Sequence, residues 1–309
     1  MYVRRACSSA VDRRSENEVA AECVGQACRR RLAMVRDMTA MDTFAARYLS
    51  GDALWGDDFT PQQIEEWFAD EREAYADLGS ASSCAEAYGY HGLNLQSGYR
   101  HLPGRRFAHA LGVGSAFGGE FLPLLERIDK ISILEPSSRL RSTDLRGVPL
   151  RYVDPSPAGD MPFETDTFEL AVCLGVLHHI PNVTKVVQEM GRVVAPGGWV
   201  VIREPVISMG DWRSRQHPGL TKGERGIPRR LLEATVRDAG FSIRSSVFCA
   251  ATLTPRIGRV LRHNLYGTRW GAAVDRALAV STAWNYRYHA DNLWQKLRPS
   301  AVCIVAQQQ

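Results

Sequence analysis

The stretch from Phe168 to Pro205 constrains the fold of this chain more than any other. It contains two short apolar runs, Leu170–Leu174 and Trp199–Ile202, and turn residues bound each of them. Such runs are typical of strands that are buried on both faces of a parallel sheet. The segment between the runs places apolar residues at helical spacing, at positions Val183, Val186, Val187, Met190, Val193 and Val194. The stretch therefore predicts a strand–helix–strand unit.

Polar side chains follow both of these predicted strands. His178 and His179 come shortly after the first strand, and Glu204 follows the second. Open α/β sheets bind ligands at the carboxyl ends of their strands. We therefore expect the two histidines and Glu204 to lie at a functional site.

Length and composition limit the class of protein. The chain has 309 residues, of which 45% are apolar, enough for one sizeable core with additions or for two domains. The net charge of +4 is too mild for a protein that coats nucleic acid. No run approaches the roughly 18 apolar residues of a membrane helix. The seven cysteines are scattered and form no CxxC pair, which favours a reducing, cytoplasmic location over a disulfide framework.

The pattern along the chain predicts a core with additions at both ends. Thr60, Pro61 and Gln63 form a good helix start, and the helix that they begin should end near Leu78. The connection before the last predicted strand is about fifty residues long, which is too long for a hairpin, so we expect an inserted helical cap. The expected parts are a weakly ordered Arg-rich leader (1–40), an N-terminal helical segment (41–105), a ligand-binding core (106–248 with 301–309) and a helical cap on the substrate side (249–300).

Five further strands and two further helices are expected in the core. The strands are predicted at Phe107–Leu111, Ile131–Leu134, Leu150–Val153, Phe241–Phe248 and Ala301–Ala306, and the helices from the glycine turn to about Ile128 and at Leu231–Ala239. Alternation of strands with helices indicates an α/β fold with a largely parallel sheet.

A glycine-rich turn follows the first core strand. Gly112 and Gly114 allow a ligand to approach the backbone, and a helix beginning there would point its N–H groups at the ligand. Glu135 ends the next strand, where a carboxylate can accept hydrogen bonds from ribose hydroxyls. A dinucleotide fingerprint requires Gly or Ala at position 117, and Phe117 argues against NAD or FAD.

With the sequence LGVLHHIPN around His178 and a Pro-Gly-Gly turn at 196–198, these motifs occur in a familiar order. Over about residues 105–250 and 301–306, the chain resembles the class I S-adenosylmethionine-dependent methyltransferases. The resemblance implies a Rossmann-like sheet of seven strands in the order 3-2-1-4-5-7-6, with the last strand antiparallel. It also implies that S-adenosylmethionine is the cofactor, bound by Gly112, Val113, Gly114, Glu135, Pro136, Asp154, Leu174 and Gly175.

The chain departs from that family at one position. The family usually has an acid two residues before the first glycine of the turn, and this chain has Ala110. Ala116 also replaces the third glycine. Because the missing acid normally helps to hold the methionine end of the cofactor, a non-catalytic binding protein with this fold is an alternative. An NAD(P)-dependent oxidoreductase is a second alternative, and Phe117 and the two histidines argue against it.

The substrate is expected to be a small molecule rather than a nucleic acid. Base-methylating relatives carry Asn/Asp-Pro-Pro-Tyr where this chain has Leu-His-His-Ile. We expect transfer to oxygen on a sugar, a polysaccharide precursor or another metabolite, with His178 or His179 as general base and Glu204 as its partner. The expected substrate-binding residues are Trp212, Arg213, Tyr90 and His91.

Purely structural roles remain open for the same residues. Either histidine can bond a backbone carbonyl, and Glu204 can pair with Arg203, Arg213 or Arg225. Adjacent histidines rarely face one ion, so a His178–His179–Glu204 metal site is not expected. The oligomeric state does not follow from the sequence.

Overall fold

A computed structural model describes residue 46 and residues 49–79, 84–209 and 224–309. The chain divides into two units, Met1–Tyr48 and Leu49–Gln309, and the fold presented below is that of the second unit. The expected leader lies outside the described residues. The expected division of the remaining chain into segment, core and cap stays a prediction.

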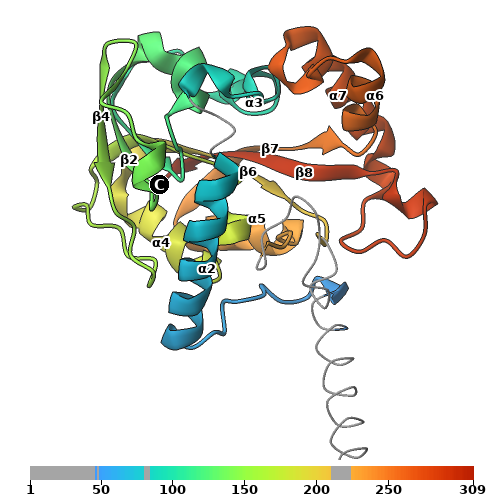
Figure 1. Cartoon of the computed structure of the whole chain (residues 1–309), viewed down its shortest axis with the longest axis horizontal. Coiled ribbons are helices and arrows are strands. Elements are labelled where there is room, and N and C mark those ends of the chain that lie inside the picture. The colour runs from blue at the N-terminus through green and yellow to red at the C-terminus, as the bar shows by residue number, and fades with distance from the viewer. Residues whose placement is uncertain (1–45, 47–48, 80–83, 210–223) are drawn as a thin grey trace, which may run out of the picture. The chain divides into compact units, whose positions relative to one another are not determined.

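One sheet forms the centre of the fold (Figure 1). Its eight strands lie in the order β3-β4-β2-β1-β5-β6-β8-β7. In chain order their bounds are β1 Phe107–Val113, β2 Ile128–Leu134, β3 Asp144–Leu145, β4 Val148–Val153, β5 Phe168–Leu174, β6 Val194–Pro205, β7 Phe241–Ala251 and β8 Pro299–Gln308.

The strand order confirms the predicted topology. Strand β3 has two residues and pairs antiparallel with β4 as a small hairpin at the edge, which the sequence did not indicate. The other seven strands follow the expected order, with β8 antiparallel to both β6 and β7. Strands β1, β2, β4, β5 and β6 run parallel, so their carboxyl ends meet at one edge of the sheet.

Helices cover both faces of the sheet (Figure 1). The α-helices are α2 Pro61–Gly79, α3 His91–Ser97, α4 Val183–Val193, α5 Arg229–Asp238, α6 Thr254–Leu261 and α7 Arg269–Thr282. Short 3₁₀ helices are η1 Ala85–Ala87, η2 Tyr99–His101, η3 Gly119–Arg127, η4 Ser138–Leu140, η5 Leu177–His179, η6 Leu265–Gly267, η7 Ala283–Asn285 and η8 Trp294–Lys296.

The strand residues alternate between two apolar cores, as a pleated sheet covered on both faces requires. In β5, Ala171 and Cys173 pack with Val187 and Met190 of α4. Leu170 and Val172 face the other side and belong to the core that contains Leu93 of α3. The buried strands thus explain the uninterrupted apolar runs in the sequence.

The segment after the glycine turn differs from the prediction. It forms the 3₁₀ helix η3, Gly119–Arg127, and not an α-helix. Pro123 lies inside it and cannot donate a backbone hydrogen bond, which disfavours an α-helical turn at this point. The start of α2 matches the prediction, because Gln63 N donates to Thr60 Oγ1 and Thr60 N donates to Gln63 Oε1 at 2.9 Å.

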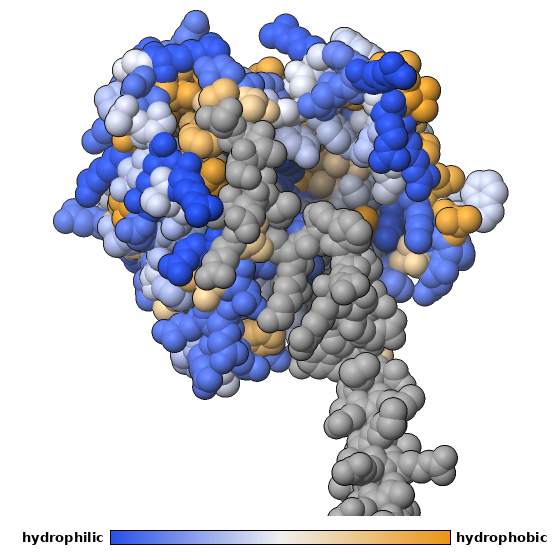
Figure 2. All heavy atoms as spheres, in the orientation of Figure 1, coloured by the Kyte–Doolittle hydropathy of each residue, from blue (hydrophilic) through white to orange (hydrophobic). Residues whose placement is uncertain are grey.

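The connection between β7 and β8 holds α6, η6, α7, η7 and η8. Most of the exposed large apolar side chains of the described residues lie on this connection, including Trp284 and Trp294. Elsewhere, hydrophilic side chains cover most of the described face in Figure 2. Within the part of the chain that the structure describes, no helix is long and apolar enough to cross a membrane.

Candidate active site

A cavity opens at the carboxyl ends of β1, β2, β4 and β5. Its wall is mostly apolar and includes Phe68, Val113, Leu134, Met161 and Ile180. The three carboxylates that line it are Glu71, Glu135 and Asp160.

The glycine turn forms one wall of the cavity. Gly114 has a φ of +63°, and a Cβ atom there would lie 2.6 Å from a methyl group of Val176. Its backbone N–H donates to Leu134 O at 2.8 Å, which ties the turn to β2. Glycine is therefore required at position 114 by both conformation and space. Gly112 does not itself line the cavity but begins this turn.

Glu135 is fully buried at the end of β2 and lines the cavity. Its carboxylate accepts hydrogen bonds from Ser137 N at 3.0 Å and from Ala116 N at 3.1 Å. Burial raises the pKa of Glu135 to about 7, although these two N–H donors act in the opposite direction. Each oxygen of an ionised carboxylate offers two lone pairs, so Glu135 keeps capacity to accept from a ligand hydroxyl.

Two other predicted cofactor residues lie elsewhere. Asp154 does not line the cavity: its side chain is 80% exposed and pairs with Arg141. Asp160 lines the cavity instead, on the loop that follows β4. Leu174 points into the core of the α3 face, since alternate residues of β5 face opposite sides. Val113, Glu135, Pro136 and Gly175 line the cavity as expected.

His178 is held between two carboxylates. Its Nδ1–H donates to Glu204 Oε2 at 2.7 Å, and its Nε2 lies 3.5 Å from Glu224 Oε1. Burial alone would lower the pKa of His178, but the hydrogen bonds to these two carboxylates raise it to about 9. His178 is therefore a cation near neutral pH in this arrangement, and a cationic imidazole cannot act as a general base.

Glu204 fixes the loop that carries both histidines. Burial alone would raise its pKa, but the hydrogen bond from His178 lowers it below the ordinary value, so Glu204 is ionised. It accepts hydrogen bonds from the backbone N–H groups of Val176 and Leu177, both at 2.9 Å, and from His178 N at 3.4 Å. The predicted contact between Glu204 and a histidine is present, together with a structural role that the sequence did not indicate.

His179 takes its partners from α2. Its Nδ1–H donates to Glu71 Oε2 at 2.9 Å, and its carbonyl accepts from Trp67 Nε1–H at 2.8 Å. His179 and Glu71 both line the cavity. The sequence predicted the helix α2 but indicated no role for Glu71. The only available signal was its place one turn after the apolar pair Trp67–Phe68.

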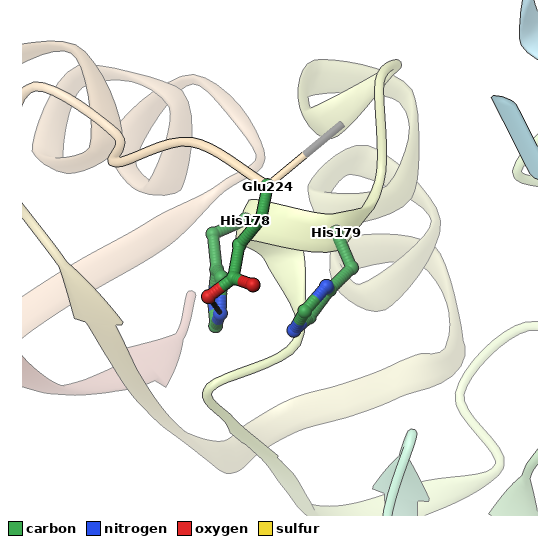
Figure 3. A group of neighbouring side chains, drawn as sticks. All are labelled: His178, His179 and Glu224. Carbon is green, nitrogen blue, oxygen red and sulfur yellow. Dashed lines mark ion pairs between the residues drawn. The ribbon is translucent and has the colours of Figure 1, made fainter. Parts of the chain in front are cut away.

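The two histidines and Glu224 form one cluster (Figure 3). One nitrogen or oxygen atom from each residue lies within 4.8 Å of the atoms from the other two. Glu224 was singled out in the sequence only as part of a polar loop and had no assigned role. Arg225 follows it and donates to three backbone carbonyls of this loop, those of Leu177, His178 and Pro181.

The two expected substrate residues that the structure describes, Tyr90 and His91, do not line the cavity. Tyr90 stacks on Tyr266 with ring centroids 5.5 Å apart, and the Arg203 guanidinium lies 4.6 Å from its ring centre. His91 packs edge-on against Tyr88. Tyr266 in turn packs against the core that contains Leu93 of α3. Trp212 and Arg213 lie outside the described residues.

Glu204 bonds His178 and not Arg203 or Arg225, two of the arginines that the sequence offered as partners. Arg203 donates to Asn94 at 2.6 Å, and Arg225 donates to backbone carbonyls.

The Cβ of Ala110, at the position of the missing acid, is fully buried within the core of the α3 face. Among the described residues at the turn, the nearest buried acid by sequence is Glu120, whose pKa burial raises to about 7.

Comparison with known families bears directly on this cavity. Residues 111–202, which run from β1 to β6, match the family model described as a methyltransferase domain. The matched segment contains the glycine turn, Glu135 and the two histidines. Residues 111–202 are therefore similar to a methyltransferase domain, and the strand order is that of the class I S-adenosylmethionine-dependent methyltransferase fold.

Individual relatives are distant. A sterol 4-C-methyltransferase of Caenorhabditis elegans is 28% identical over 100 residues, which span 30% of each chain. Among solved structures, the [4+2]-cyclase SpnF matches with a TM-score of 0.48 and 16% identity, over 81% of this chain and 96% of its own. A methyltransferase of Mesorhizobium loti matches with a TM-score of 0.45 and 16% identity, over 68% and 94%.

Proposed function

We propose that this protein transfers a methyl group from S-adenosylmethionine to a small molecule in the cavity. The single observation that carries the proposal is the buried Glu135 beside the Gly114 turn, at the wall of the cavity. This arrangement fits a nucleoside that presents ribose hydroxyls to a carboxylate and lies against backbone without side chains. The cofactor would supply an activated methyl group on a sulfonium.

Different residues of the cavity would hold different parts of the cofactor. Glu135 would accept the ribose hydroxyls, and the turn at Gly114 would let the cofactor approach the backbone. Asp160, beside the apolar Met161, would accept from the amino group of an adenine. Asp160, which pairs with Lys185 at 2.8 Å, replaces Asp154 in this role because Asp160 lines the cavity and Asp154 does not.

We assign the acceptor side of the cavity to His179. It lines the cavity, and Glu71 fixes its ring by accepting from Nδ1. A histidine oriented in this way can take a proton from a hydroxyl, which favours transfer to oxygen. His178 would stabilise the loop as a cation and would not be the base. The match to a sterol methyltransferase spans 30% of each chain, so it supports methyl transfer without supporting a sterol acceptor.

Isothermal titration calorimetry with S-adenosylhomocysteine and, separately, with NAD tests the cofactor. We expect binding of S-adenosylhomocysteine at one site per chain and no heat from NAD. Asp160→Asn should weaken binding about tenfold, because a neutral amide oxygen accepts a hydrogen bond about 1.4 kcal/mol more weakly than a carboxylate does. Asp154→Asn is the matched control and should leave binding unchanged.

The opposite results have definite meanings. A response to NAD alone would support the oxidoreductase alternative, and a response to neither ligand would refute the proposed cofactor. Equal weakening by Asp154→Asn and Asp160→Asn would contradict the assignment of Asp160. For the acceptor side, His179→Ala should lower turnover on any acceptor that a screen identifies while keeping S-adenosylhomocysteine binding, and full activity would exclude His179 as base.

A further inference from the structure

The two histidines of the site are held in the same way. Each uses its Nδ1–H to bond a carboxylate: His178 bonds Glu204 at 2.7 Å and His179 bonds Glu71 at 2.9 Å. Histidines that bind a metal ion almost always donate the other ring N–H to a carboxylate, a carbonyl or water. That bond fixes the tautomer and the ring orientation, so that Nε2 is the ligating atom. Here the pattern occurs twice, at adjacent residues whose ring centroids are 4.1 Å apart.

A third ligand stands beside the two rings. The Glu224 carboxylate lies next to His178, and the ring of His179 is turned toward the same point (Figure 3). The 3.5 Å between His178 Nε2 and Glu224 Oε1 is long for a charge-assisted hydrogen bond. It is close to the roughly 3.4 Å that separates two ligands of one tetrahedral ion with bonds of about 2.1 Å. The whole set lies within 4.8 Å, so small side-chain rotations would close it around an ion.

We propose that His178, His179 and Glu224 bind one divalent first-row transition metal ion at the edge of the cavity, through both Nε2 atoms and the Glu224 carboxylate. Two imidazoles and one carboxylate suit zinc, cobalt, nickel, manganese and iron better than magnesium or calcium. Glu204 and Glu71 are the outer carboxylates that orient the two histidines.

The surrounding charges favour a cation at this point. The carboxylates of Glu71 and Glu204 accept hydrogen bonds from the two imidazole rings, and the Glu224 carboxylate lies 3.5 Å from His178 Nε2. The Arg225 guanidinium donates to backbone carbonyls of the histidine loop, and Arg72 lines the cavity with Glu71 and His179.

The proposed ion would keep an open coordination position. Three protein ligands leave at least one coordination position of a tetrahedral ion for water or for an acceptor oxygen. His179 lines the cavity, so this open position lies at the acceptor side of the proposed active site. The inference goes beyond the proposed function, and the metal is tested without cofactor or acceptor. With the ion bound, His179 Nε2 would be a ligand, so His179 would act as the base only in the metal-free protein.

The test uses the full chain after dialysis against a chelator, with zinc and cobalt as separate probes. Calorimetry should show one zinc ion per chain, and cobalt should give the visible absorption bands of a tetrahedral Co²⁺ site. Glu224→Gln and His179→Ala should each weaken binding at least tenfold and abolish those bands. Glu71→Gln, which removes an outer carboxylate, should weaken binding by about 10–100-fold. His263→Ala removes an exposed histidine elsewhere and should change nothing.

Some outcomes would overturn the proposal. Absence of zinc binding, or equal binding by wild type, Glu224→Gln and His179→Ala, would refute a metal site at this cluster. Loss of binding in His263→Ala would place the ion elsewhere. Circular dichroism melting of every variant separates lost binding from lost folding, and Glu224→Gln keeps the shape of the side chain if His179→Ala unfolds. Failure of zinc binding with intact S-adenosylhomocysteine binding would leave the proposed function standing.

Discussion

The two sides of the cavity are built in different ways. The glycine-turn side, formed by the ends of β1, β2 and β4, uses backbone conformation and one buried carboxylate whose contacts lie within about twenty residues of it. The histidine side joins η5 to residues far away in the sequence: Glu71 of α2, Glu204 of β6 and Glu224. The first side is a local product of strand and turn, and the second is a product of tertiary folding. A single substitution should therefore have different consequences on the two sides.

The largest effect is expected from Glu204→Ala on the histidine side. It leaves the N–H groups of Val176 and Leu177 and the charge of His178 without their buried acceptor. Removing one partner of a buried ion pair costs about 3–5 kcal/mol of unfolding free energy. Urea denaturation measures the loss. Glu169→Gln, at a partly exposed carboxylate that accepts from Ala108 N, is the control and should cost less than about 1 kcal/mol. Equal losses would mean that Glu204 does not hold the loop.

On the glycine-turn side, the next effect is a pH dependence due to Glu135. Its folded pKa of about 7 exceeds the ordinary value of 4.5, so the folded protein binds the proton more tightly than the unfolded chain. This contribution is fully present below pH 4.5 and is lost as the pH rises to 7, by about 3 kcal/mol in total. Glu135→Gln should remove that part of the slope in denaturation curves between pH 4.5 and 7.5. The exposed Glu126→Gln is the control, and a slope unchanged by Glu135→Gln would contradict the shift.

The smallest effect compares two glycines with similar backbone conformations. Gly114 and Gly197 have φ values of +63° and +76°, but only at Gly114 would a Cβ atom meet a neighbour, Val176 at 2.6 Å. Gly197→Ala should cost about 1 kcal/mol of stability through strain alone. Gly114→Ala should cost about 2 kcal/mol or more, because the side chain of Val176 must move as well. Thermal denaturation of both variants measures the difference, and equal costs would show that the turn does not press against the β5 loop.

The sequence predicted the glycine-turn side well because its signals are local. The apolar runs predicted the parallel strands, the glycine spacing predicted the turn, and the position of a carboxylate at a strand end predicted Glu135. The strand order followed from a family resemblance. The outward position of Asp154, which pairs with Arg141, did not follow from the sequence, because a strand end alone does not say which carboxylate turns inward. The η3 segment was predicted as α-helix although Pro123 disfavours it.

The histidine side could be predicted only in part. His178, His179 and Glu204 follow strands that lie next to each other, so their proximity was accessible from the sequence. Glu71 and Glu224 were not, since their contacts depend on how α2 and the chain before α5 pack on the finished sheet. Tyr90 and His91 do not line the cavity, which the sequence did not indicate, because proximity in sequence to the core does not fix the face on which α3 packs.

The position of β8 has a consequence for how the chain is made. This strand fills the space between β6 and β7, yet it leaves the ribosome after both of them. At a synthesis rate of about 5–20 residues per second, β6 stays without its partner strand for roughly 5–20 s, until Pro299–Gln308 are made. An unpaired strand edge presents backbone N–H and C=O groups that can pair with a strand of another chain. Nascent copies on neighbouring ribosomes would be most vulnerable to aggregation during that interval.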